Sequence, residues 1–194
     1  MEKGTFNSAD LQAALTVLRR GGVILYPTDT IWGIGCDATK SEAVKRIFEL
    51  KQRADSKAML VLMDSSDNLA QYVDVPEAAA SLLEATTEGR PMTIIYPNAC
   101  GVAPELIAED GSIGIRITRE AFSNALCRQL GKPIVSTSAN ISGETSPANF
   151  AQISPKIING VDYVCRYRQS DNTPKQPSAI VKIHEDNTFN IIRG

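Results

Sequence analysis

Short apolar runs alternate with amphipathic segments along the chain, and this alternation most restricts the possible fold. Val23–Tyr26 and Met92–Tyr96 are each closed by a proline, and Ser112–Thr118 carries isoleucines at alternate positions. Runs of this length between turn residues are typical of strands. Apolar residues three and four positions apart, as in the segment after Ser8, predict helices between them. Because the spacing is irregular, we expect an α/β (α+β mixed) fold, a twisted open mixed sheet flanked by helices.

Capping residues and prolines predict where the helices begin. Ser8 is expected to cap the first helix, and Thr39 and Glu42 have capping-box spacing at the start of the second. Residues 28–40 are expected to form a loop after a buried strand. Pro76 is expected to open a further helix.

Composition bounds the class of protein. The 194 residues include 20 Lys and Arg against 22 Asp and Glu, a formal net charge of −2. This balance argues against a protein that mainly coats nucleic acid, although a local basic cleft is compatible with it. No run approaches the ~20 apolar residues of a membrane span, and residues 1–10 lack the pattern of a secretory signal. We therefore expect a cytoplasmic protein with one domain over residues 1–194.

The common catalytic and metal-binding patterns are missing from the sequence. The four cysteines include no Cys-x-x-Cys pair, so they are predicted to be reduced thiols, and no metal-ligating residues are predicted. His184, the single histidine, is predicted to be a surface residue. Gly33 and Gly35 formally fit a dinucleotide-binding fingerprint. The segment Pro27-Thr28-Asp29-Thr30 separates them from the preceding strand, however, which argues against a nucleotide-binding Rossmann unit.

Three polar segments are unusual. Residues 26–36 follow a strand end with hydroxyls, a carboxylate and glycines, and residues 132–143 carry small hydroxyl and amide side chains after another strand. Lys51, Arg53 and Lys57 place three cations within seven residues, a pattern that can neutralise a polyphosphate. The plain alternatives are a polar turn, a hydroxyl-rich loop and a solvated helix end whose cations favour the helix dipole.

Together, these segments resemble the YrdC family, the threonylcarbamoyl-AMP synthases of tRNA modification. The resemblance runs from about Leu15 to Arg193, with the three segments in the family's order and spacing. It implies a single YrdC-like domain of the short bacterial type with a concave, positively charged cleft. It also implies formation of threonylcarbamoyl-AMP and pyrophosphate from L-threonine, bicarbonate or CO₂, and ATP. Mg²⁺ would be bound mainly through phosphates, and a downstream transferase would pass the threonylcarbamoyl group to tRNA.

The resemblance also assigns roles by matching position. The implied L-threonine contacts are Thr30, Arg116, Ser138 and Ser178. The implied ATP contacts are Arg53, Lys57, Ser112, Ser136, Asn140, Ser146 and Arg193. The catalytic candidates are the cations Lys51, Arg53 and Lys57. The chain departs from the family pattern at Asp29 (usually Glu), Trp32 (usually Tyr or Phe), Ala54 (usually Pro) and around Arg90 and Gln176.

The implied reaction suits a chain without a nucleophile–base pair. The threonine amine captures CO₂, and the resulting N-carboxylate attacks the α-phosphorus and expels pyrophosphate. The attacking group is already an anion, so the protein must mainly align the substrates and neutralise charge. Arg53, Lys57, Arg193 and Mg²⁺ are predicted to neutralise the triphosphate, and Arg116 to hold the threonine carboxylate as a planar fork.

Two other interpretations remain open at this point. A non-catalytic module could grip structured RNA, double-stranded RNA or tRNA, with the same cleft of cations and small donors. A divergent relative could instead carbamoylate another small molecule, because the segments around Arg90 and Gln176 depart from the family pattern.

Overall fold

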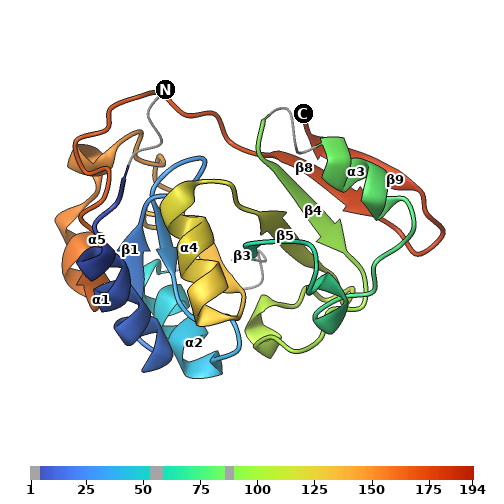
Figure 1. The fold of residues 1–194 in the computed structure, drawn as a ribbon, viewed down its shortest axis with the longest axis horizontal. Coiled ribbons are helices and arrows are strands. Elements are labelled where there is room, and N and C mark those ends of the chain that lie inside the picture. The colour runs from blue at the N-terminus through green and yellow to red at the C-terminus, as the bar shows by residue number, and fades with distance from the viewer. Residues whose placement is uncertain (1–4, 53–58, 86–89) are drawn as a thin grey trace.

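Strands from both halves of the chain combine into one mixed sheet (Figure 1). The computed structural model describes residues 5–52, 59–85 and 90–194. Within these residues the strand order is β7-β1-β2-β6-β3-β5-β4-β8-β9. The pairs β1–β7, β3–β5 and β4–β8 are parallel and the other neighbours are antiparallel, which confirms the predicted mixed sheet. The strands are β1 (Ile24–Tyr26), β2 (Gly33–Gly35), β3 (Leu60–Met63), β4 (Met92–Tyr96), β5 (Ile113–Ile117), β6 (Ile134–Ser138), β7 (Tyr163–Val164), β8 (Ala179–Ile183) and β9 (Phe189–Arg193).

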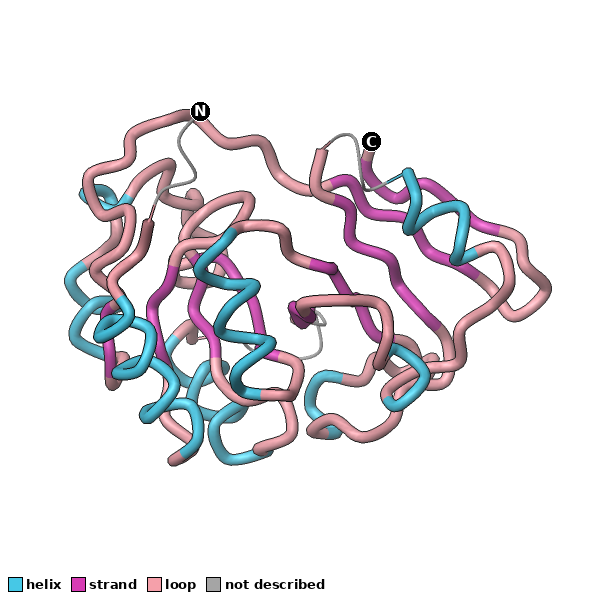
Figure 2. Tube along the Cα trace, in the orientation of Figure 1, coloured by secondary structure: helices cyan, strands magenta, loops and turns pink. Residues whose placement is uncertain are grey.

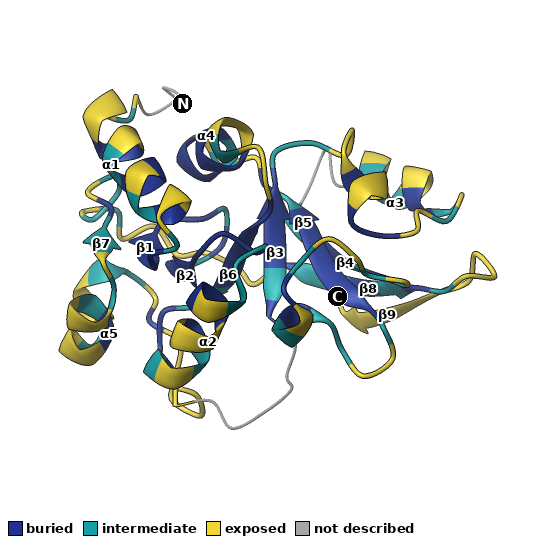
Figure 3. Ribbon diagram, turned by 90° about the horizontal axis from the view of Figure 1, so that it is seen from below, coloured by how far each residue is buried: buried dark blue, intermediate teal, exposed yellow. Residues whose placement is uncertain are grey.

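Helices cover both faces of the β1–β6–β3 part of the sheet (Figure 3). Tyr26 and Leu62 pack under α1 and α4, whereas their strand neighbours Leu25 and Val61 pack on the opposite face in the core that includes α2. Burial on both faces explains why β1 and β3 consist of apolar residues and one tyrosine. The α-helices are α1 (Ser8–Arg19), α2 (Ser41–Leu50), α3 (Ala79–Ala85), α4 (Ala121–Leu130) and α5 (Pro155–Gly160), and the 3₁₀ turns are η1 (Leu69–Gln71), η2 (Pro104–Leu106) and η3 (Phe150–Gln152).

The other half of the sheet is covered on one face only. Ile94 and Tyr96 of β4 and Ile183 of β8 are buried in a core against which Leu82 of α3 packs. The alternate side chains of β4 and β5 instead line hollows on the other face. A long irregular segment, residues 165–178, runs from the β7 side of the molecule to β8, as Figure 2 shows. The sheet thus offers one open face on which polar side chains can gather.

Local capping differs from the prediction at both helix starts. Asn7 caps α1, because its Oδ1 accepts a hydrogen bond from Ala9 N at 2.8 Å, so Ser8 is the first helical residue and not the cap. The Thr39 hydroxyl donates to Asp37 Oδ1 at 2.7 Å and makes no cap, and α2 has no side-chain capping bond. The cause is Asp37, whose carboxylate competes for the Thr39 hydroxyl and fixes the turn before the helix.

The predicted loop over residues 28–40 contains a strand. β2 lies between β1 and β6, although two of its three residues are glycines, which weaken a strand prediction. Glycine is needed here because a Cβ at Gly35 would lie 2.4 Å from the Val135 carbonyl oxygen and 2.6 Å from Tyr26 Cε1. β2 therefore joins the first polar segment to β6, and so brings it next to residues 136–138. Among the helices in the described part of the chain, none combines the length and apolar character needed to cross a membrane.

Candidate active site

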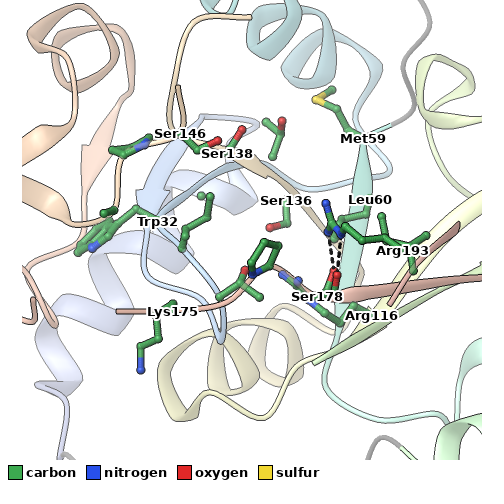
Figure 4. A pocket seen from close by; sticks show the side chains of 18 residues that line it. Trp32, Met59, Leu60, Arg116, Ser136, Ser138, Ser146, Lys175, Ser178 and Arg193 are labelled. Atoms are coloured by element: carbon green, nitrogen blue, oxygen red, sulfur yellow. Dashed lines mark hydrogen bonds between the residues drawn. The ribbon is translucent and has the colours of Figure 1, made fainter. Parts of the chain in front are cut away.

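A hollow of about 500 Å³ opens on the uncovered face of the sheet (Figure 4). We call it the main hollow. Its walls come from segments far apart in the sequence, including the turn before β2, the end of β6, β5, and the β8–β9 pair. Of the predicted site residues, it brings together Thr30, Arg116, Ser136, Ser138, Ser146, Ser178 and Arg193.

Arg116 lies on β5 and is only 3% exposed. Its neighbours Ile115 and Ile117 pack in the core on the other face, so strand alternation directs the guanidinium towards the hollow. One guanidinium nitrogen, Nη2, lies 3.2 Å from Asp29 Oδ1. Within the described residues, Arg116 Nε has no hydrogen-bond partner. A buried cation with donors to spare can bind the carboxylate of a ligand with planar, two-donor geometry.

The Asp29 carboxylate is the counter-ion of Arg116. Burial raises the pKa of Asp29 above its ordinary value, and the nearby Arg116 opposes that rise. Asp29 departs from the family pattern, but its pairing with Arg116 was not predictable, because the two residues are 87 positions apart in the chain. The pair leaves the main hollow less positive than its arginines alone would make it.

Thr30 presents a hydrogen-bond acceptor to the main hollow. The Thr28 hydroxyl donates to the Ile31 carbonyl oxygen at 2.7 Å, so its single proton is used. Thr28 Oγ1 therefore accepts from Thr30 N and from the Thr30 hydroxyl, each at 3.1 Å. The Thr30 hydroxyl then has only lone pairs left for a ligand. An acceptor on Thr30 and a cation on Arg116 in one hollow match the ammonium and carboxylate groups of an amino acid.

Ser178 and Arg193 form the wall of the main hollow on the side of β8 and β9. Arg193 donates through Nε to the Ser178 carbonyl oxygen at 2.9 Å and through Nη2 to Ser178 Oγ at 3.4 Å (Figure 4). Ser178 Oγ also lies 3.0 Å from Thr93 Oγ1, a neighbour that sequence analysis missed. An irregularity in the β8–β9 ladder pairs Arg193 with Ile180, a residue that lines the hollow. Burial, followed by the nearby cations Arg90 and Arg116, lowers the pKa of Arg193, and an anion bound here would relieve that repulsion.

Lys51 does not line the main hollow. It is 2% exposed, and its Nζ donates to the carbonyl oxygens of Ser138 and Asn140 at 2.5 and 2.6 Å. In addition, Ser142 N donates to the Lys51 carbonyl oxygen at 2.9 Å. The direct catalytic role implied for Lys51 by the family resemblance stays a prediction. Lys51 holds the loop that follows β6 and so sets the position of Ser138.

The remaining predicted residues are divided among three places. Asn140 lines no described hollow, and its Nδ2 donates to the carbonyl oxygens of Ile141 and Glu144. Ser112 lines a second hollow next to the main one. Arg53 and Lys57 lie outside the described residues. The structure thus brings most, but not all, of the predicted set to one site.

Lys175 and Trp32 are among the residues of the main hollow that were not predicted as contacts. Lys175 lines it from the segment before β8, although an exposed lysine in an irregular segment gives no sequence signal of its own. Trp32 lines it from the turn before β2, with its ring centroid 4.9 Å from that of Phe150. Within the described residues, no group of three or more His, Cys, Asp or Glu is close enough to hold a metal ion.

The fold and site define a mixed α/β protein with a hollow lined by arginine and hydroxyl side chains on its open sheet face. The model of the Sua5/YciO/YrdC family, described as "Telomere recombination", matches residues 16–194, and the chain belongs to this family. The threonylcarbamoyl-AMP synthase of Xanthomonas campestris pv. campestris is 34% identical over 160 residues, 81% of this chain and 86% of the relative. That of Pseudoalteromonas translucida is 32% identical over 178 residues, 90% of this chain and 93% of the relative.

Solved structures show the same fold. The structure of E. coli YciO superposes with a TM-score of 0.82 at 25% identity, covering 96% of this chain and 89% of YciO. The structure of P. abyssi Sua5 complexed with L-threonine superposes with a TM-score of 0.80 at 24% identity, covering 93% of this chain but 52% of Sua5. These comparisons confirm the resemblance drawn from the sequence motifs.

Proposed function

We propose that this chain is a threonylcarbamoyl-AMP synthase that forms threonylcarbamoyl-AMP and pyrophosphate from L-threonine, bicarbonate or CO₂, and ATP. Relatives that carry this activity in their names are 32–35% identical over 81–90% of the chain. The observation that carries the proposal is the convergence of Thr30, Arg116, Ser138 and Ser178 in one hollow.

In this proposal the amino acid is held at both of its charged ends. Arg116 binds the threonine carboxylate, and the acceptor on Thr30 binds the amine. With its nitrogen held at Thr30, the amine in its neutral form adds to CO₂, forms the N–C bond and releases one proton. Ser138 and Ser178 supply small donors and acceptors at opposite walls, where they can bind the threonine hydroxyl or the new carboxylate.

The second step transfers the adenylyl group. A carbamate oxygen attacks the α-phosphorus, the bond from that phosphorus to the bridging oxygen breaks, and pyrophosphate leaves with the electron pair. Arg193, with Arg53 and Lys57 as further candidates from the family resemblance, would neutralise the triphosphate. Mg²⁺ would be held mainly by phosphate oxygens and water, a mode that needs no carboxylate cage. Alignment of the three substrates can supply about 7–11 kcal/mol of the barrier reduction.

The product chemistry implies partners. A mixed anhydride of a carbamate and AMP is reactive, so we propose that a separate transferase consumes it and passes the threonylcarbamoyl group to tRNA. Because that acceptor is tRNA, we propose a cytoplasmic location.

The test is pyrophosphate release from ATP by the full chain. We expect release only when L-threonine, bicarbonate, ATP and Mg²⁺ are all present, with one pyrophosphate per threonylcarbamoyl-AMP formed. Release that is independent of threonine, or absent with all four components, would contradict the proposal. Nucleotide-independent affinity for structured RNA without release would instead favour an RNA-binding module, and release with another amine in place of threonine would favour a divergent carbamoylating enzyme.

A further inference from the structure

Arg168 does not line the main hollow, but it contacts the turn that carries Thr30. It lies in the irregular segment 165–178, whose far end supplies Ser178 to the hollow wall. The Arg168 side chain is 19% exposed, and its Nη1 donates to the Thr28 carbonyl oxygen at 3.1 Å. Arg168 therefore joins the turn on one side of the hollow to the segment that leads to the other side.

Two carboxylates fix the orientation of the Arg168 guanidinium. Nε and Nη2 donate to Asp171 Oδ2 at 2.9 and 2.7 Å, and Nη1 lies 3.9 Å from Oε1 of Glu120, the N-cap of α4. Asp171 Oδ1 in turn accepts from Thr173 N at 2.9 Å. One side of the planar fork is thus bound to its own segment, and the other side is directed at Thr28.

The backbone of Arg168 is in the left-handed region, with a φ of 63°. Glycine and asparagine adopt this conformation readily, whereas arginine does so rarely. A residue keeps such a conformation when the surrounding structure requires it. Here the guanidinium binds three separate parts of the fold, so the side chain supplies the requirement. An arginine at a position whose backbone favours glycine points to a function for the guanidinium.

The position of Thr28 determines what the site presents to a ligand. Thr28 is 2% exposed, and its Oγ1 accepts from Thr30 N and from the Thr30 hydroxyl, each at 3.1 Å. Asp29, between these two residues, lies 3.2 Å from Arg116 Nη2. Burial raises the pKa of Asp29, and the nearby charges of Arg116 and Arg168 both oppose that rise. A shift of Thr28 therefore moves Thr30 directly and Arg116 through its ion pair.

We propose that Arg168 is a positioning residue for the threonine site, which holds the turn of residues 28–30 against segment 165–178 and so sets the spacing of Thr30 and Arg116. The proposal deepens the proposed function and rests on it, because L-threonine is the substrate whose binding it explains. Arg168 acts through the turn and touches no substrate.

The effect is expected to be specific for threonine. The end of the segment at β8 is held by separate bonds, because Arg90 Nε donates to the Pro177 carbonyl oxygen at 2.6 Å. Arg193, the predicted triphosphate contact, donates to the Ser178 carbonyl oxygen at 2.9 Å. Loss of the Arg168 guanidinium therefore disturbs the turn and leaves the ATP side of the hollow in place.

The experiment uses two variants of the full chain and one matched control. Arg168→Asn suits the left-handed backbone but lacks the guanidinium, and Arg168→Lys keeps the charge on a single nitrogen in place of the fork. The control is Arg19→Asn. Arg19 Nη2 donates to the Gln129 carbonyl oxygen at 3.0 Å, so it also joins two elements through a backbone carbonyl, and neither residue lines the main hollow. Thermal unfolding of each chain is measured before its kinetics.

Initial rates are measured with threonine and ATP varied in turn. For Arg168→Asn we expect the KM for threonine to rise at least about tenfold and the KM for ATP to stay within about twofold. Arg168→Lys is expected to raise the KM for threonine at least about threefold, and Arg19→Asn to leave both KM values within about twofold. A KM for threonine within about twofold of wild type in both Arg168 variants, or an equal rise in both KM values, overturns the inference. Arg168→Lys decides the matter if Arg168→Asn does not fold.

Trp32 provides a measurement that needs no substrate. It is the single tryptophan of the sequence, it follows Thr30 closely, and it lines the main hollow (Figure 4) with its ring 4.9 Å from that of Phe150. A shift of the turn changes this ring contact, so the emission spectrum of the folded Arg168 variant is expected to differ from wild type, and that of Arg19→Asn to match it. An unchanged spectrum overturns the inference. If the wild-type chain releases no pyrophosphate, the proposed function fails, and the spectra still decide whether Arg168 positions the turn.

Discussion

Lys51→Met tests whether Lys51 positions the loop after β6 or takes part directly in the chemistry. Methionine keeps most of the apolar stem but removes the ammonium that binds the carbonyl oxygens of Ser138 and Asn140. An unpaired buried polar group costs about 1–3 kcal/mol, and two carbonyls lose a charged donor here. We therefore expect a loss of about 3 kcal/mol in the free energy of unfolding. For a chain of this size that is a fall of roughly 6–12 °C in Tm.

Equilibrium urea unfolding of wild type, Lys51→Met and the control Lys156→Met measures this loss. Lys156 is exposed on α5, so its replacement is expected to change the free energy of unfolding by less than about 0.5 kcal/mol. The KM for threonine is expected to rise in Lys51→Met because Ser138 moves with its loop. Lost turnover with an unchanged unfolding midpoint would refute the positioning role and support direct participation in the chemistry.

Three other outcomes are expected. Gly35→Ala places a Cβ 2.4 Å from the Val135 carbonyl oxygen, so urea unfolding should show a loss of about 1–3 kcal/mol, and an unchanged midpoint would contradict the close approach of β2 and β6. Burial, then the bond from its hydroxyl to Asp10, raises the pKa of Tyr163 from 10.0 to about 12. The stabilisation of the folded state by the neutral Tyr163 phenol is thus complete below pH 10 and is lost as pH rises through about 12. In unfolding experiments over this pH range, the free energy of unfolding of Tyr163→Phe should therefore fall less steeply than that of wild type. Arg116→Lys removes the planar fork, so initial rates should give a KM for threonine raised about tenfold or more, and an unchanged KM would remove Arg116 from the threonine site.

Strands with strong apolar periodicity were predictable from the sequence. A strand whose residue types are required by one tertiary contact was less predictable. β1, β4 and β5 lie where the sequence places them, because their apolar residues alternate or run continuously between turn residues. β2 was not predictable, because its glycines carry no strand signal and are required only by the close approach of Val135 and Tyr26. That approach is a property of the folded sheet and leaves no local pattern.

The same distinction holds for the site. Arg116 was predictable as a cleft or paired residue because a charged side chain in an isoleucine-rich strand must be satisfied. Its partner Asp29 was not, because the pairing depends on the crossing of distant segments. The contacts of Lys51 were not predictable for a related reason. A cation at the end of a helix has the same sequence signal whether it faces a ligand or, as here, buried carbonyl oxygens.

A crystal structure of the full chain with L-threonine and a non-hydrolysable ATP analogue tests the central claim most directly. We predict the threonine carboxylate at the Arg116 guanidinium, the amine at Thr30, and the triphosphate beside Arg193. An amino acid bound away from Arg116, or a triphosphate bound away from Arg193, would contradict the proposed function.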